Sequence, residues 1–234
     1  MVFSCMARLA RIVVPQLPHH VTQRGNRREA IFFADGDHEV YCALLAEQAR
    51  RAEVAVWAYC LMPNHIHLIL VPKRADALGN AVGEAHRRYT NFINARAGWT
   101  GHLFQRRFSS VVMDDSHLKA AVCYVSLNPV RAGLVARAED WPWSSVRAHL
   151  AGRDDSLVSV GPVLERMLDL SALLKDDCNE AFAVLRRAER TGRPAGAEEF
   201  VVGLERRLGR PIARRLPGRR PAPVTAEKQL NLLQ

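Results

Sequence analysis

The sequence predicts an α+β domain in which an antiparallel sheet carries helices on one face, followed by a helical C-terminal appendage. Over residues 1–150, short apolar runs alternate with long segments of helical periodicity. Glycine, proline and asparagine mark the junctions between them. The order is strand, helix, strand, strand, helix, strand and then another helix, which is the split β-α-β order of ferredoxin-like folds.

The first part of this pattern predicts one strand and one helix. The strand runs from about Leu17 to Arg24 and ends at Gly25-Asn26. Asp35-Gly36-Asp37 then offers a helix start, and the helix continues to Arg51. Helical spacing within it is carried by Tyr41, Leu44, Leu45 and Gln48.

Two adjacent strands and a long helix follow. Val54 to Leu61 is a near-continuous apolar strand, a turn is marked by Pro63-Asn64, and His65 to Val71 is the next strand. Ala75 to Ala97 has helical periodicity and is ended by Gly98 and Gly101. Its apolar stripe consists of Leu78, Val82, Ala85, Tyr89, Phe92 and Ile93.

A last strand and helix complete the domain. Leu103 to Met113 is predicted to be extended. Asp114-Asp115-Ser116 caps a helix that runs toward Asn128 and stops near Pro129, because proline disfavours helix in the residue before it.

Beyond about Leu150 the strand signals fade. Helices are predicted over Pro162 to Leu174, Asp177 to Arg190 and Ala197 to Leu208. Seven arginines and no acidic residue lie between Arg206 and Arg220, in a stretch interrupted by prolines. We therefore expect a domain over residues 1–150, a helical appendage over 151–208 and a basic, flexible tail over 209–234.

The composition limits the class of protein and of partner. The chain has 234 residues, a formal net charge of +9 and a sequence pI of about 9.9, which favours a polyanionic partner. No apolar run approaches the ~20 residues of a membrane helix, and no signal-peptide core is evident, so no membrane association is expected. The scattered cysteines are typical of reduced thiols in a cytoplasmic protein; they are Cys5, Cys42, Cys60, Cys123 and Cys178.

Two histidines begin the strand after Pro63-Asn64. Because side chains alternate along a strand, His65 and His67 project from the same face, with Ile66 and Leu68 on the other. Two imidazoles on one rigid strand can supply two ligands to a divalent metal. The alternative is a pair of half-exposed histidines without a ligand.

The helix after Asp115 offers further polar groups. Leu118, Val122 and Val125 form its apolar stripe, so that His117, Tyr124 and Asn128 lie on roughly the opposite face, with Tyr124 and Asn128 one turn apart. The alternative is simply a solvated polar face. Tyr89 is a rival nucleophile because it follows His86-Arg87-Arg88, but its spacing places it on an apolar stripe.

At this point the residues resemble a known family. His65-Ile66-His67, followed by Tyr124-Val-Ser-Leu-Asn128-Pro129-Val130-Arg131-Ala132-Gly133, is similar to the single-tyrosine HUH transposases, and more closely to the bacterial REP-associated tyrosine transposases of the IS200-like group. The resemblance covers about residues 10–150. Other matching stretches are Thr22-Gln23-Arg24-Gly25-Asn26, Gly101-His102-Leu103-Phe104-Gln105-Arg106-Arg107-Phe108 and Asp140-Trp141-Pro142-Trp143-Ser144-Ser145.

The resemblance implies an enzyme that cuts and rejoins single-stranded DNA at repetitive palindromic hairpins, through a covalent 5′-phosphotyrosine intermediate. It implies Tyr124 as the nucleophile, Mg²⁺ or Mn²⁺ as the metal, and His65, His67 and Asn128 as its ligands. The partner is single-stranded or hairpin DNA, and the protein is expected to be a monomer or a homodimer. Candidate DNA-binding residues lie close in sequence to these elements; they are Arg24, Arg27, Arg28, Arg87, Arg88, Arg106, Arg107, Lys119 and Arg131.

Other functions compete with this interpretation. A domesticated, non-catalytic DNA-binding regulator would share most of these residues. An RNA-recognition module has the same strand order, but its aromatic signature is absent from the sequence. A small-molecule metallohydrolase is disfavoured by the basic charge. Trp141 and Trp143 are available for base stacking, although Trp-Pro-Trp is more typical of packing at the end of a domain.

Overall fold

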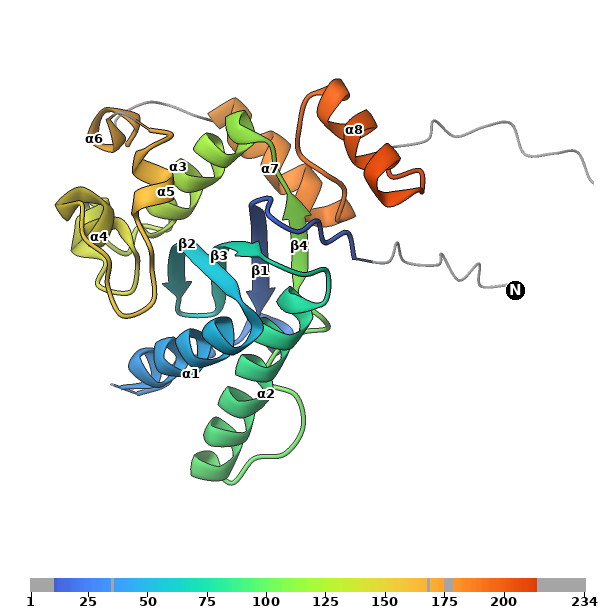
Figure 1. Ribbon diagram of the computed structural model, residues 1–234. Coiled ribbons are helices and arrows are strands. Elements are labelled where there is room, and N and C mark those ends of the chain that lie inside the picture. Colours follow the sequence, from blue (N-terminus) through green and yellow to red (C-terminus); the bar gives the residue numbers. More distant parts are fainter. Residues whose placement is uncertain (1–10, 35, 168, 175–178, 214–234) are drawn as a thin grey trace, which may run out of the picture.

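An antiparallel sheet forms the centre of the structure, a computed structural model that describes residues 11–34, 36–167, 169–174 and 179–213. Over these residues the strand order is β2-β3-β1-β4, so β1 and β3 are the central pair (Figure 1). The strands are β1 (His19–Arg24), β2 (Val54–Met62), β3 (His65–Pro72) and β4 (Ser109–Val112). This arrangement confirms the predicted split β-α-β fold.

Two long helices cover one face of the sheet, as predicted. They are α1 (Asp37–Ala52) and α2 (Ala77–Ala97). Asp37 is the first residue of α1, and its carboxylate fixes the preceding turn by accepting hydrogen bonds from the backbone N–H groups of Phe33 and Ala34 at 2.8 and 3.0 Å. Phe92 departs from the predicted stripe of α2: it is 37% exposed, because it lies at the edge of the buried face, where Arg96 sits over its ring.

The helix α3 (Asp115–Arg131) lies on the other face of the sheet. The side chain of Asp114 caps it by accepting a hydrogen bond from the N–H of His117 at 2.9 Å. The predicted stripe of Leu118, Val122 and Val125 is buried. The helix extends two residues beyond Pro129, to Arg131, so the sequence placed its end slightly too early. Pro129 removes one backbone hydrogen bond but is tolerated within the last turn.

The segment after α3 forms shorter elements than the sequence predicted. The predicted helix over Pro162 to Leu174 is divided into α5 (Gly161–Leu164) and α6 (Leu170–Leu173). Of the segment predicted to be extended, Leu103 to Met113, only Ser109–Val112 forms a strand, which is β4. Residues 103–108 form a loop. The remaining elements are η1 (Asn26–Arg28), η2 (Ala138–Asp140), α4 (Val146–Ala151), α7 (Asn179–Thr191) and α8 (Glu198–Leu208).

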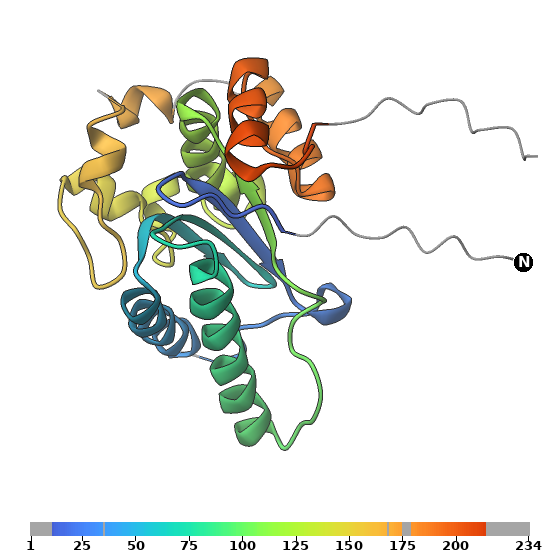
Figure 2. The ribbon, with the colours of Figure 1, turned by 45° about the vertical axis from the view of Figure 1, so that its right-hand side comes forward.

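The C-terminal helices pack on the sheet domain. Figure 2 shows α7 and α8 beside α3 and the end of β4. Leu185 and Ala188 of α7 are buried in the same apolar cluster as Val122 of α3. The sheet therefore has helices on both faces, and α7 supplies part of the second layer. Most of the predicted basic tail, residues 214–234, lies outside the described residues, as do Cys5 and Cys178.

None of the helices within the described ranges combines the length and apolar character needed to cross a membrane.

Candidate active site

The pairing of β1 with β3 creates a polar strip on the face of the sheet that α3 covers. In this antiparallel register, Arg24 is opposite His65 and Thr22 is opposite His67. Residues two apart share a face, so His20 belongs to the same strip. On the opposite face Ile66, Leu68 and Leu70 are buried among α1 and α2, as the alternation predicted.

The two strand histidines are held as neutral imidazoles. Burial lowers the pKa of His65 to about 4 and lowers that of His67 well below its ordinary value. The Nδ1 of His65 lies 2.7 Å from Oδ1 of Asn64, which can only accept, so this nitrogen carries the proton and donates it. The Nε2 of His65 therefore keeps its lone pair for a ligand.

Helix α3 places its two polar residues against this strip. The ring of Tyr124 is perpendicular to that of His67, with the centroids 5.3 Å apart, and Nδ2 of Asn128 is 3.1 Å from Nε2 of His67. Burial, and next the charge of Glu189, raise the pKa of the Tyr124 phenol above 10. Three of the groups chosen from the sequence thus lie in contact, although they come from two elements.

Two residues that sequence reasoning missed join this cluster. The Nε2 of His20 lies 3.0 Å from Nδ1 of His67, and the two rings are stacked at 5.2 Å. On its other side, Nδ1 of His20 lies 3.3 Å from Oε1 of Glu189, which comes from α7. Burial lowers the pKa of His20 to about 4 and raises that of Glu189 to about 7.

A cleft of about 340 Å³ opens over these groups. The side chains of Arg24, Arg106 and Arg107 line it together with His65, His67, Tyr124 and Glu189. The side chain of Gln23, which is 5% exposed, holds the loop that carries Arg106 and Arg107. Its amide donates to the backbone oxygens of Gln105 and Arg106, each at 3.1 Å. Arg106 has φ of 61°, a conformation rare for residues other than glycine and frequent at functional sites.

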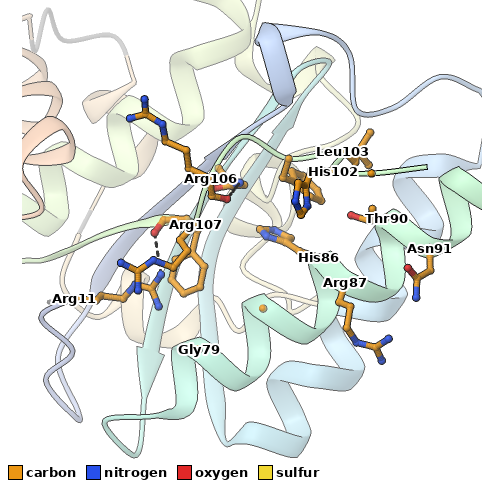
Figure 3. A pocket seen from close by; sticks show the side chains of 15 residues that line it. Arg11, Gly79, His86, Arg87, Thr90, Asn91, His102, Leu103, Arg106 and Arg107 are labelled. Atoms are coloured by element: carbon orange, nitrogen blue, oxygen red, sulfur yellow. Dashed lines mark hydrogen bonds between the residues drawn. The ribbon is translucent and has the colours of Figure 1, made fainter. Parts of the chain in front are cut away.

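A second cavity of about 490 Å³ lies next to this cleft, on the α2 side (Figure 3). The two spaces share Gln23, Arg106 and Arg107 in their walls. Arg11 and Arg87 add further positive charge, and Figure 3 shows them on either side of the opening. Gly79 and Gly83 form part of the helical wall, and a Cβ on either would meet nothing within 4 Å. The cavity is therefore basic and is left wide by two residues without side chains.

The remaining candidates do not line the cleft. Arg87 and Arg88 form ion pairs with Glu84, and Arg88 also with Glu47. Arg27, Arg28 and Lys119 are exposed and do not line the cleft, and the guanidinium of Arg131 lies over the ring of Phe182 at 4.7 Å.

Two aromatic alternatives have structural roles. Tyr89 is fully buried, and its hydroxyl donates to the backbone oxygen of Ile31 at 2.7 Å, as its apolar spacing predicted. Trp141 donates from Nε1 to the backbone oxygen of Leu61 at 3.1 Å, and Trp143 stacks on His38 at 4.4 Å. Both tryptophans therefore pack against the domain.

Among the residues that the structure describes, two sets of side chains could hold a metal ion. His65, His67 and Asn128 offer two neutral imidazoles and an amide oxygen, which fit a divalent cation once the Asn128 amide turns its oxygen toward His67. His20, His67 and Glu189 form the other set, whose ligand atoms lie within 4.8 Å of one another. His67 belongs to both, through a different ring nitrogen in each.

Comparison with known proteins identifies the class. Residues 13–128 match the profile of the family described as Transposase IS200 like. A Haemophilus influenzae protein named among the REP-associated tyrosine transposases is 29% identical over 99 residues, which cover 38% of this chain and 56% of that protein. The Escherichia coli REP-associated tyrosine transposase is 21% identical over 127 residues, which cover 54% of this chain and 73% of that protein. The chain thus spans little more than half the length of the Haemophilus relative.

A solved structure shares the fold. A REP-associated tyrosine transposase bound to a REP hairpin aligns with a TM-score of 0.54 at 20% identity, covering 66% of this chain and 92% of that one. The fold and the profile match together define a transposase domain. The chain belongs to the IS200-like transposase family.

Proposed function

We propose that this protein cleaves and rejoins single-stranded DNA at palindromic hairpins, with Tyr124 as the nucleophile and a divalent metal held by His65, His67 and Asn128. The observation that carries the proposal is the position of Tyr124: its ring meets that of His67 inside a cleft lined by arginines. The names of the relatives support the class of reaction.

The chemistry fits these side chains. The phenolic oxygen of Tyr124 attacks phosphorus, the bond to the 3′ oxygen breaks, and the phenolic proton ends on the released 3′-hydroxyl. When bound, Mg²⁺ or Mn²⁺ would neutralise charge on the scissile phosphate and orient it. A phosphotyrosine ester has a phenol as its leaving group, and a tyrosine phenol ordinarily has a pKa near ~10. A 3′-hydroxyl can therefore reverse the step and rejoin the strand without ATP.

The surroundings of Tyr124 act on its phenol in opposite directions. Burial and the charge of Glu189 raise its pKa, whereas Arg186, a hydrogen bond with Asn128 and Arg131 lower it. The last three groups favour the phenolate that develops as the oxygen attacks phosphorus.

The arginines indicate how the strand enters. Arg24, Arg106 and Arg107 lie at the cleft, and Arg11 and Arg87 continue the positive charge along the second cavity. We infer that the strand runs from the cleft into this cavity, with its phosphates on the arginines and one nucleotide against the α2 wall.

The proposal is tested with end-labelled single-stranded DNA that contains a palindromic hairpin, in Mn²⁺, on a denaturing gel. We expect a covalent adduct with the wild type and with Tyr89→Phe, and none with Tyr124→Phe. An adduct in Tyr124→Phe would show that another residue is the nucleophile. Tight binding of the hairpin without any adduct in the wild type would instead favour the non-catalytic regulator.

A further inference from the structure

The helix α7 reaches the candidate metal site from outside the family domain. We propose that Glu189, acting through His20, is a positioning residue that fixes the ring of His67 with its Nε2 turned toward the metal. This inference rests on the metal site proposed above. It adds two residues, one of them more than fifty positions beyond the segment that matches the family, residues 13–128.

The first step concerns the tautomer of His67. With the Asn128 amide oriented as in the structure, Nε2 of His67 accepts from Nδ2, so the proton of this neutral ring is on Nδ1. The same tautomer is required if Nε2 is to bind a metal. The proton on Nδ1 then needs an acceptor, and Nε2 of His20 is 3.0 Å away.

The second step follows from the first. If Nε2 of His20 accepts, its own proton is on Nδ1, which faces Oε1 of Glu189 at 3.3 Å. Both of these atoms are buried, and neither has a well-formed hydrogen bond within the described part of the chain. The two atoms already lie within hydrogen-bond distance, and a small rotation that aligns the N–H of His20 with Oε1 would join them. A metal-bound histidine is commonly oriented in this way by a carboxylate.

The third step concerns Glu189 itself. The hydroxyl of Ser109 donates to the backbone oxygen of Glu189 at 3.0 Å, which ties this turn of α7 to β4. The neighbouring Leu185 and Ala188 are buried in the core. The carboxylate is therefore presented by a fixed backbone, as a positioning role requires.

The alternative is direct ligation, in which His20, His67 and Glu189 hold the metal themselves. That arrangement would use Nδ1 of His67 and would separate the ion from His65 and Asn128. The two arrangements differ in ligand set, so Co²⁺ absorption distinguishes them.

The test measures Mn²⁺ binding by calorimetry on the full chain. We expect Glu189→Ala and His20→Phe to weaken Mn²⁺ binding by about 10-fold or more, the loss typical when a group behind a metal ligand is removed. Glu189→Gln keeps an acceptor oxygen and should restore most of the affinity. The Co²⁺ spectrum should keep its shape in Glu189→Ala, because the ligands are unchanged.

Two controls separate the possible causes. Ile93→Ala weakens the core on the α2 side of the sheet, away from the histidines, and Glu198→Ala removes an exposed carboxylate from α8. Both should bind Mn²⁺ like the wild type. An equal loss in Ile93→Ala would overturn the positioning role, as would full affinity in Glu189→Ala or a changed Co²⁺ spectrum. If the wild type binds no Mn²⁺, the metal site of the proposed function fails and the positioning role fails with it. If wild-type binding is lost in His67→Ala but unaffected in Glu189→Ala, only the positioning role fails.

Discussion

The segment that matches the family and the helices that follow it contribute to the same cluster in different ways. Residues 13–128 supply His65, His67, Tyr124 and Asn128, each on an element whose period is visible in the sequence. The C-terminal segment supplies Glu189 and Phe182, both from α7, whose ring and carboxylate face the cluster. The first contribution is local and patterned, whereas the second depends wholly on tertiary packing.

The largest expected effect tests the first contribution. His65→Ala and His67→Ala should each reduce metal-dependent cleavage by roughly 10³-fold or more, because each removes an imidazole ligand of the proposed ion. Asn128→Ala should be milder, at about 10-fold, because water can replace one oxygen ligand. Single-turnover cleavage in Mn²⁺ measures both. Full wild-type activity in excess chelator would contradict the metal requirement.

A matched pair tests the second contribution. Phe182 is 1% exposed and contacts the ring of Tyr124 at a centroid distance of 5.2 Å, whereas Ile93 is fully buried on the inner face of α2, away from the cluster. Phe182→Ala and Ile93→Ala should each lower the free energy of unfolding by about 3 kcal/mol. Only Phe182→Ala should also slow cleavage well below the unfolding temperature. Equal cleavage rates in the two variants would mean that α7 only stabilises the fold.

The second cavity sharpens the comparison within the family segment. Gly83 lies in a helix with free space around it, so Gly83→Ala should raise the free energy of unfolding by about 0.5–1 kcal/mol. Gly83→Leu fills the cavity and should weaken binding of single-stranded DNA by about 10-fold, if one nucleotide stacks there. Fluorescence anisotropy with a labelled strand provides the measurement. Unchanged affinity in Gly83→Leu would place the strand elsewhere.

The smallest effect is expected from the basic tail. Deleting residues 214–234 removes Arg214, Arg215, Arg219 and Arg220. Affinity for DNA should fall modestly, and the dependence of log affinity on log salt should become shallower, because fewer counterions are released. Cleavage at saturating protein should be retained. An identical salt slope would show that the tail makes no contact with DNA.

Most of the fold could be predicted, because its elements carry local signals. The alternation of His65, Ile66, His67 and Leu68 and the stripe of Leu118, Val122 and Val125 specify both period and face. The division of Pro162 to Leu174 could not be predicted, since short apolar helices have no distinctive period. The three-segment division of the chain stays a prediction, and the contacts of α7 tie the second segment closely to the first.

The site was predicted less completely than the fold. His20 lies on the same face of the first strand as Thr22 and Arg24, because these residues are two and four positions apart. Alternation along this strand could therefore have placed His20 beside His67 once the strand pairing was known. Glu189 offered no such signal, because an acidic residue between arginines on a helix looks like an ordinary surface residue. Register and helix packing, which bring these two residues together, are set by contacts distant in sequence.

The covering of Tyr124 by α7 has a consequence in time. A chain is synthesised from its N-terminus at ~5–20 residues per second, and domains fold as they emerge. The sheet, Tyr124 and the histidines precede α7, so they leave the ribosome several seconds before the helix that contacts them. During that interval the aromatic face of Tyr124 that later meets Phe182 is open to water. The nascent domain would acquire its fold first and its finished nucleophile only when the last third of the chain is in place.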